Sequence, residues 1–138
     1  GELAHLQALV GRLQLGQDVR FAGPLYGQEK LAAYVDADVV ASPGAYEIFG
    51  LVPFEALMCG TPVVVGDGSG VSELIREAGA GYVVAPGDVA ALADKLRRDL
   101  TSGVEAQAQV ASGQAFVRRE LAWNAISGHL EDLYAGIT

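Results

Sequence analysis

The sequence has few of the residues from which metal sites and disulfide frameworks are built. Its 138 residues include one cysteine, Cys59, and two histidines, His5 and His129. A single thiol cannot form a disulfide framework, and neither histidine has a companion at a spacing typical of zinc ligands. We therefore predict no metal site, and we interpret Cys59 as a small residue of the core.

Positive charge is also scarce, with nine lysines and arginines against 17 acidic residues and a net charge of −8. Nucleic acid and anionic membrane surfaces are bound through basic faces, so the composition argues against both as partners. No apolar run approaches the length of a membrane span, and the N-terminus lacks the pattern of a signal peptide. These absences predict a soluble, cytoplasmic protein.

The apolar residues of the chain follow two patterns that alternate along it, one with helical spacing and one of short continuous runs. Hydrophobic residues make up 51% of it, and its length suits one domain, residues 1–138. Segments with helical spacing separate short Val- and Ala-rich runs, which we predict as strands at about 18–23, 38–43, 62–66 and 82–85. Such runs indicate a parallel sheet with helices on both faces, a Rossmann-like α/β fold, followed by one or two helices over 104–136.

Three loops at the expected carboxyl ends of these strands are rich in glycine and proline: "GPLYG", "SPGAYEIFG" and "GDGSG". Ligands of open parallel sheets bind beyond that edge, and small residues let a ligand approach the backbone. The helix after the second loop would present the amides of Gly50, Leu51 and Val52, together with the positive end of its dipole. We predict a diphosphate site there.

Two carboxylates flank this predicted anion site. Glu47 lies in the loop and Glu55 lies one turn inside the helix. Acceptors on both sides of a diphosphate suit the hydroxyls of a nucleotide-sugar. The alternative is structural: Glu55 would stabilise the start of its helix, and Glu47 would cap loop amides. The pair Asp36 and Asp38 has the D-x-D spacing of some metal sites, but it lies at the amino end of a strand and we interpret it as structural.

The stretch "SPGAYEIFGLVPFEALMCGTPVVVGDGSGVSELI", followed by "GYVVAPGDVAALADKL", resembles the donor-binding, C-terminal domain of retaining glycosyltransferases with the GT-B fold, especially family 4 (group 1). Members of that family carry two glutamates in an E-x7-E motif, and here Glu47 and Glu55 occupy those positions. The resemblance extends from about residue 3 to residue 136.

The resemblance implies a role for each residue of the motif. Glu47 would be the catalytic carboxylate and would bind hydroxyls of the transferred hexose, next to the amides near Phe49 and Gly50. Glu55 would accept hydrogen bonds from the ribose. The amides of Gly50, Leu51 and Val52 would hold the diphosphate, and Leu25 or Tyr26 would border the base.

The family also implies the chemistry. The donor would be a UDP- or GDP-sugar, transferred with retention of configuration and without a cofactor or an essential metal.

The family pattern has parts that this sequence does not match. These are the acceptor-binding N-terminal domain, expected as a partner, and the first two strands of the donor-binding domain with their basic residues. We expect the chain alone to transfer little or no sugar. The missing strands would lie between segments 18–23 and 38–43. We hypothesise that these two segments pair directly, or that another chain fills the gap through self-association.

Three other interpretations remain open at this point. One is a glycogen-synthase-like enzyme of the same fold, although the residues around Glu47 fit the family 4 motif better. Another is a non-catalytic module for nucleotide-sugar binding or assembly. The last is a structural domain that binds no ligand.

Overall fold

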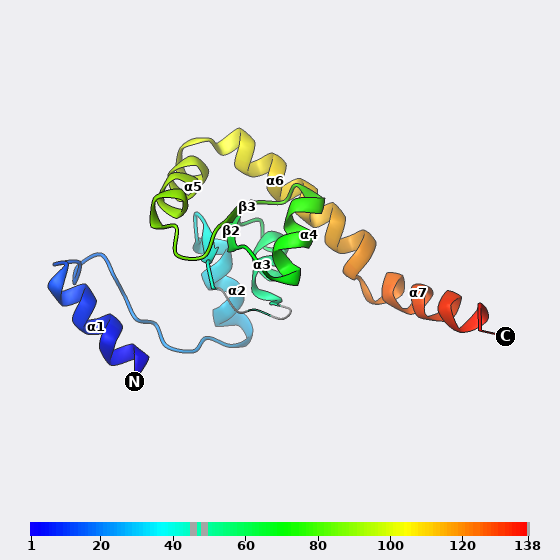
Figure 1. Ribbon diagram of the computed structural model, residues 1–138, viewed down its shortest axis with the longest axis horizontal. Coiled ribbons are helices and arrows are strands. Elements are labelled where there is room, and N and C mark those ends of the chain that lie inside the picture. Colours follow the sequence, from blue (N-terminus) through cyan, green and yellow to red (C-terminus); the bar gives the residue numbers. More distant parts are fainter. Residues whose placement is uncertain (45–46, 48–49, 138) are drawn as a thin grey trace. The chain divides into compact units, whose positions relative to one another are not determined.

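The computed structural model describes residues 1–44, 47 and 50–137 (Figure 1). The chain divides into two compact units, Gly1–Lys30 and Leu31–Thr138, and each is described by itself below.

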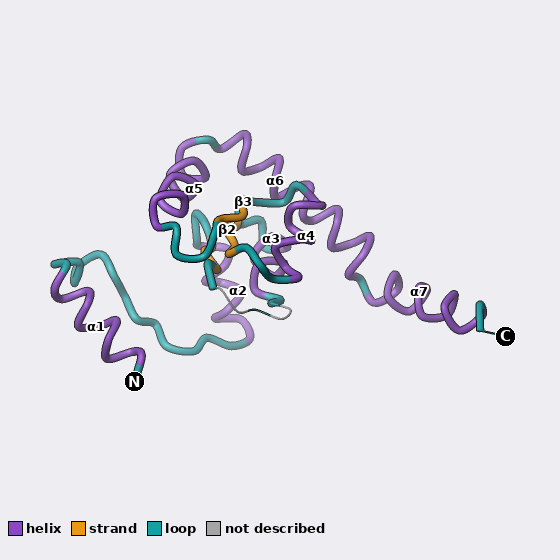
Figure 2. Tube along the Cα trace, viewed as in Figure 1, coloured by secondary structure: helices purple, strands orange, loops and turns teal. Residues whose placement is uncertain are grey.

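The N-terminal unit contains helix α1 (Glu2–Arg12) and the first turn of α2 (Gly27–Asp36). Between them, residues 19–26 are neither helix nor strand, as the loop colouring in Figure 2 shows. The strand predicted at 18–23 is therefore wrong. A strand is held by hydrogen bonds to a neighbouring strand, and the described residues supply none at this position.

The second unit is built on a sheet of three parallel strands in the order β1 (Val40–Ser42), β2 (Val63–Gly66), β3 (Tyr82–Val84). Val40 pairs with Val63, and Val64 pairs with Tyr82. These strands fall within the predicted segments 38–43, 62–66 and 82–85, which are confirmed. Residues 18–23 belong to the N-terminal unit, so their direct pairing with the first of these strands stays a hypothesis; among the described strands, β1 pairs with β2.

The core lies around β2, whose four residues are all buried. Helices α3 (Val52–Met58), α4 (Gly70–Ala78) and α6 (Gly103–Phe116) contribute the other large side chains of the core, namely Phe54, Leu57, Val71, Ile75, Val110 and Phe116. Continuous Val character in β2 is what a strand covered on both faces requires, and it explains why this segment was predictable.

The chain after β3 is helical. Helix α5 (Val89–Thr101) begins at Asp88, whose Oδ1 accepts a hydrogen bond from the Ala91 amide at 2.9 Å. Helix α6 passes so close to α3 that a Cβ on Gly113 would lie 2.8 Å from Leu57 Cδ1. A π-helical turn (Val117–Leu121) joins α6 to α7 (Trp123–Ala135), so the prediction of one or two helices over 104–136 is confirmed.

No helix in the described parts of the chain has both the length and the apolar character needed to cross a membrane.

Candidate functional site

The loop after β1 is in direct contact with the last residue of β2 at the carboxyl end of the sheet. A Cβ on Gly66, the last residue of β2, would lie 2.6 Å from the carbonyl oxygen of Gly44 and 2.8 Å from that of Pro43. Because both neighbours are backbone atoms, no larger residue fits at position 66 without displacing the β1 loop. The sequence therefore uses glycine to bring the Glu47 loop against the end of the central strand.

Glu47 lies over the residue that leads into α3. A Cβ on Gly50 would lie 2.8 Å from Glu47 Cγ and 3.2 Å from Glu47 Oε2, so the carboxyl group occupies the space that a side chain at 50 would need. Gly50 is buried, whereas Glu47 and Leu51 are exposed. Pro53 follows in the first turn of α3, where its missing N–H is no loss. The structure thus brings the predicted hexose ligand, Glu47, next to the predicted diphosphate segment.

Glu55 lies within α3 and is half-buried. Its Oε2 accepts a hydrogen bond from the Tyr34 hydroxyl on α2, with an oxygen–oxygen distance of 3.0 Å. Burial, followed by the hydrogen bond to Glu55 and the charge of that carboxylate, raises the pKa of Tyr34 to about 12. Tyr34 therefore stays protonated at neutral pH and remains the donor of this hydrogen bond.

Sequence reasoning missed Tyr34. The contact joins residues that are 21 positions apart, on helices that neither spacing nor a local motif links. The available signal was a tyrosine among the small residues of "LAAYVDA", which by itself suggests only core packing.

Three predicted site residues are not placed by this geometry. Phe49 lies outside the described residues. Leu25 and Tyr26 belong to the N-terminal unit, where Tyr26 is 75% exposed, so their role at the base stays a prediction.

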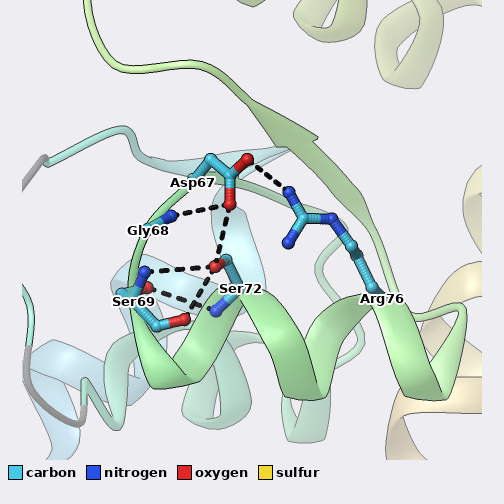
Figure 3. Close-up of polar contacts among 5 residues, drawn as sticks. All are labelled: Asp67, Gly68, Ser69, Ser72 and Arg76. Atoms are coloured by element: carbon cyan, nitrogen blue, oxygen red, sulfur yellow. Dashed lines mark hydrogen bonds and ion pairs between the residues drawn. The ribbon is translucent and has the colours of Figure 1, made fainter.

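The "GDGSG" loop after β2 is held by its own polar network (Figure 3). Asp67 Oδ2 pairs with Arg76 Nη2 at 2.6 Å, and Asp67 Oδ1 accepts from the Gly68 amide at 2.6 Å. These two hydrogen bonds, that from Arg76 first, lower the pKa of Asp67. Ser69 caps α4 and exchanges hydrogen bonds with Ser72. The network fixes the path of the backbone from β2 into α4, and within it Arg76 is paired with the carboxylate of Asp67.

Two of the cavities in the second unit border residues singled out in the sequence. One of about 330 Å³ borders Glu55 and has otherwise mainly apolar walls, including Leu31, Phe54 and Leu121. Another of about 410 Å³ lies at the amino ends of the strands and is lined by Asp38 and Asp99 among others. Asp38 therefore lies at the amino edge of the sheet, as predicted. No group of three or more metal-ligating side chains occurs in the part of the chain that the structure describes.

Comparison with known proteins assigns this chain to a family. The family model described as "Glycosyl transferases group 1" matches residues 1–115. The chain belongs to the glycosyl transferases group 1 family. A relative within it, the phosphatidyl-myo-inositol mannosyltransferase of Mycobacterium leprae, is 35% identical over 97% of this chain and 35% of its own length.

Solved structures agree with that membership. Sucrose-phosphate synthase from Thermosynechococcus elongatus superposes with a TM-score of 0.83 at 34% identity, covering 99% of this chain and 34% of that one. Anabaena Alr3699/HepE, solved with UDP and with UDP-glucose, gives a TM-score of 0.85 at 24% identity, covering 97% of this chain and 36% of that one. The latter likeness shows the fold alone. The chain spans about a third of the length of these group 1 relatives and structures.

Proposed function

We propose that this chain is the donor-binding part of a retaining hexosyltransferase that uses a nucleotide-diphosphate sugar. The observation that carries the proposal is the position of Glu47 over Gly50, at the entry to the helix that bears Glu55, in a chain of the glycosyl transferases group 1 family. One carboxylate then lies against the segment that leads into α3, and the other lies within that helix.

In this proposal each group binds one part of the donor. Glu47 is the catalytic carboxylate and accepts hydrogen bonds from hydroxyls of the hexose. The amides of Gly50, Leu51 and Val52 receive the diphosphate, and Glu55 accepts hydrogen bonds from the ribose. Charged acceptors form stronger hydrogen bonds than neutral ones, so each glutamate contributes both affinity and orientation.

The reaction would exchange one glycosidic bond for another. The bond between the anomeric carbon and the diphosphate oxygen breaks, and the diphosphate leaves with the electron pair. The acceptor oxygen attacks on the same face, passes its proton to the departing diphosphate and forms the new bond. Amide donors aimed at the departing diphosphate would stabilise the charge that develops there. No step in this scheme calls for a metal.

The proposal is supported by the solved neighbours, because Anabaena Alr3699/HepE shares the fold and was solved with UDP and with UDP-glucose. A uridine donor is therefore the first to test, and a guanosine donor is the comparison.

The test is a calorimetric titration of the 138-residue chain with UDP-glucose and with GDP-mannose. We expect binding of one of them, weakened about tenfold or more by Glu47→Ala and by Glu55→Ala, since each removes a charged hydrogen-bond acceptor. Glu131→Ala, on the exposed surface of α7, serves as the control and is expected to bind like the parent chain. Unchanged affinity in both site variants would contradict the proposal.

Transfer is measured separately, with a simple sugar acceptor and a labelled donor. We expect the 138-residue chain to bind donor but to transfer little or no sugar. Turnover at an ordinary enzyme rate would overturn this part of the proposal.

A further inference from the structure

We propose that Tyr34 is a positioning residue of the donor site: it orients the Glu55 carboxylate and thereby sets how strongly the site distinguishes a ribose from a deoxyribose. This inference rests on the proposed function, because it assumes that Glu55 faces the ribose. It adds a residue on a different helix, which the glutamate motif does not contain.

The first support is the contact itself. The Tyr34 hydroxyl approaches Glu55 Oε2 at 3.0 Å, which is a normal distance for a hydrogen bond to a carboxylate. With a pKa raised to about 12 by burial, the phenol donates at every pH at which the chain would work. The direction of the hydrogen bond is therefore fixed: the phenol gives the proton and the carboxylate accepts it.

The second support is that Tyr34 is itself held in place. Its side chain packs against the buried core, and its backbone carbonyl accepts a hydrogen bond from the hydroxyl of Thr61, just before β2. Thr61 is 2% exposed. The phenol oxygen is thus fixed relative to the central strand, and it can hold the carboxylate at a defined angle.

The third support is the setting of Glu55. The cavity of about 330 Å³ beside it has mainly apolar walls, among them Leu31 and Phe54. A glutamate side chain has three rotatable bonds, and fixing it costs conformational entropy. A donor that already holds one oxygen removes part of this cost before the nucleotide arrives. Pre-organisation of this kind increases affinity for the hydroxyl that the carboxylate recognises.

The experiment compares Tyr34→Phe with the parent chain for binding of UDP, 2′-deoxy-UDP and 3′-deoxy-UDP by calorimetry. Phenylalanine keeps the ring and loses only the hydroxyl. The parent chain should prefer UDP over at least one deoxy analogue by about tenfold or more, because that analogue leaves a charged acceptor unpaired. In Tyr34→Phe we expect UDP to bind several-fold more weakly, with little change for that analogue, so the preference falls to about twofold.

The chain provides a matched control. The Tyr82 hydroxyl donates to Glu105 Oε1 at 2.6 Å, a second Tyr–Glu hydrogen bond away from the loops after β1 and β2. Tyr82→Phe removes an equivalent bond and should leave the UDP to deoxy-UDP ratio unchanged. A merely structural role for Tyr34 would lower stability in the same way as Tyr82→Phe and would not alter that ratio.

A double-mutant cycle completes the test. If Tyr34 acts through Glu55, adding Tyr34→Phe to Glu55→Ala should weaken UDP binding no further. The inference fails if Tyr34→Phe keeps the parental ratio, or if its effect is undiminished in the Glu55→Ala background. If the parent chain binds GDP in place of UDP, the same comparison is made with the deoxy analogues of GDP. Absence of binding of both UDP and GDP by the folded parent chain would instead overturn the proposed function, so the two failures are distinguishable.

Discussion

Asp99 is an acidic side chain on the apolar side of α5, at helical spacing from Leu92 and Leu96. It is 7% exposed, and both of its carboxylate oxygens are buried without a hydrogen-bond partner in the described structure. Burial first, and then the negative charge of Glu105, raise the pKa of Asp99 from 3.8 to about 6. The folded state therefore favours the protonated acid.

This shift predicts how stability depends on pH. A carboxyl group with a raised pKa contributes most to stability below its unfolded value of 3.8, and that contribution is lost as the pH rises through about 6. Urea unfolding at pH 4.5 and pH 7.5 should show Asp99→Asn losing about 2 kcal/mol less than the parent chain over this interval.

Asp94→Asn provides the control for this experiment, because Asp94 lies on the same helix, is half-exposed and pairs with Arg98 at 3.6 Å. The slope of stability against pH is compared between the two variants, because each removes one negative charge from α5. An equal slope in parent and Asp99→Asn would show that Asp99 is not buried as described.

The two carboxylates of the candidate site were predictable because they lie in one motif of fixed spacing. Glu47 and Glu55 could be named from the sequence, whereas Tyr34 and the buried state of Asp99 could not. Both of these depend on which helix faces which. The contact of Tyr34 with Glu55 spans 21 residues, and Asp99 acquires its environment only when α6 packs beside it.

At the scale of the elements, two glycines allow close backbone contacts at the two ends of the strands, Gly66 at the carboxyl end and Gly81 at the amino end. Gly66 ends β2 against the backbone of Gly44, and Gly81 precedes β3 with its Cβ position 2.5 Å from the carbonyl oxygen of Val63. Alanine at either position must displace backbone. We expect each substitution to lower the free energy of unfolding by about 1–3 kcal/mol.

The two substitutions should differ in their effect on the ligand. Gly66→Ala pushes on the loop that carries Glu47, so it should weaken UDP binding by roughly tenfold, since a loosened site loses its hydrogen-bond geometry. Gly81→Ala acts at the amino edge and should bind UDP like the parent chain. Calorimetry at a temperature where both variants are folded separates the two effects, and equal affinity for UDP in both would contradict this account of the loop contact.

The elements themselves were predictable to different degrees. The buried run around Val64 specified its strand, because a four-residue apolar stretch between turns suits a strand with both faces covered. The segment 18–23, DVRFAG, contains apolar residues but also two charged ones, and it forms no strand. Composition gives a segment the ability to be a strand, and a neighbouring strand must then provide the hydrogen bonds.

At the scale of the whole molecule, β1 is the outermost described strand on its side of the sheet. The Val40 amide donates to the Pro62 carbonyl at 2.9 Å, so it faces β2. Alternate residues of a strand direct their backbone groups to opposite sides. The amide of Ala41 therefore points away from β2, and no described strand lies on that side.

Hydrogen exchange followed by NMR tests this edge. In dilute solution we expect the Ala41 amide to exchange far faster than the Val40 amide, because it lacks a strand partner. Protection of Ala41 that grows with protein concentration would support the hypothesis that another copy of the chain fills the gap. Protection that is independent of concentration would mean that another segment of the same chain pairs there.

The loop residues 19–26 have one practical consequence. Their backbone belongs to neither helix nor strand, and all of their side chains except that of Leu25 are exposed. Exposed chain of this kind is where proteases cut folded proteins. A single cleavage there would divide the chain into a fragment that contains α1 and a fragment that contains the three strands and the helices from α2 onward. If a smaller fragment of the protein appears on a gel during purification, this segment is therefore the first to examine as the site of cleavage.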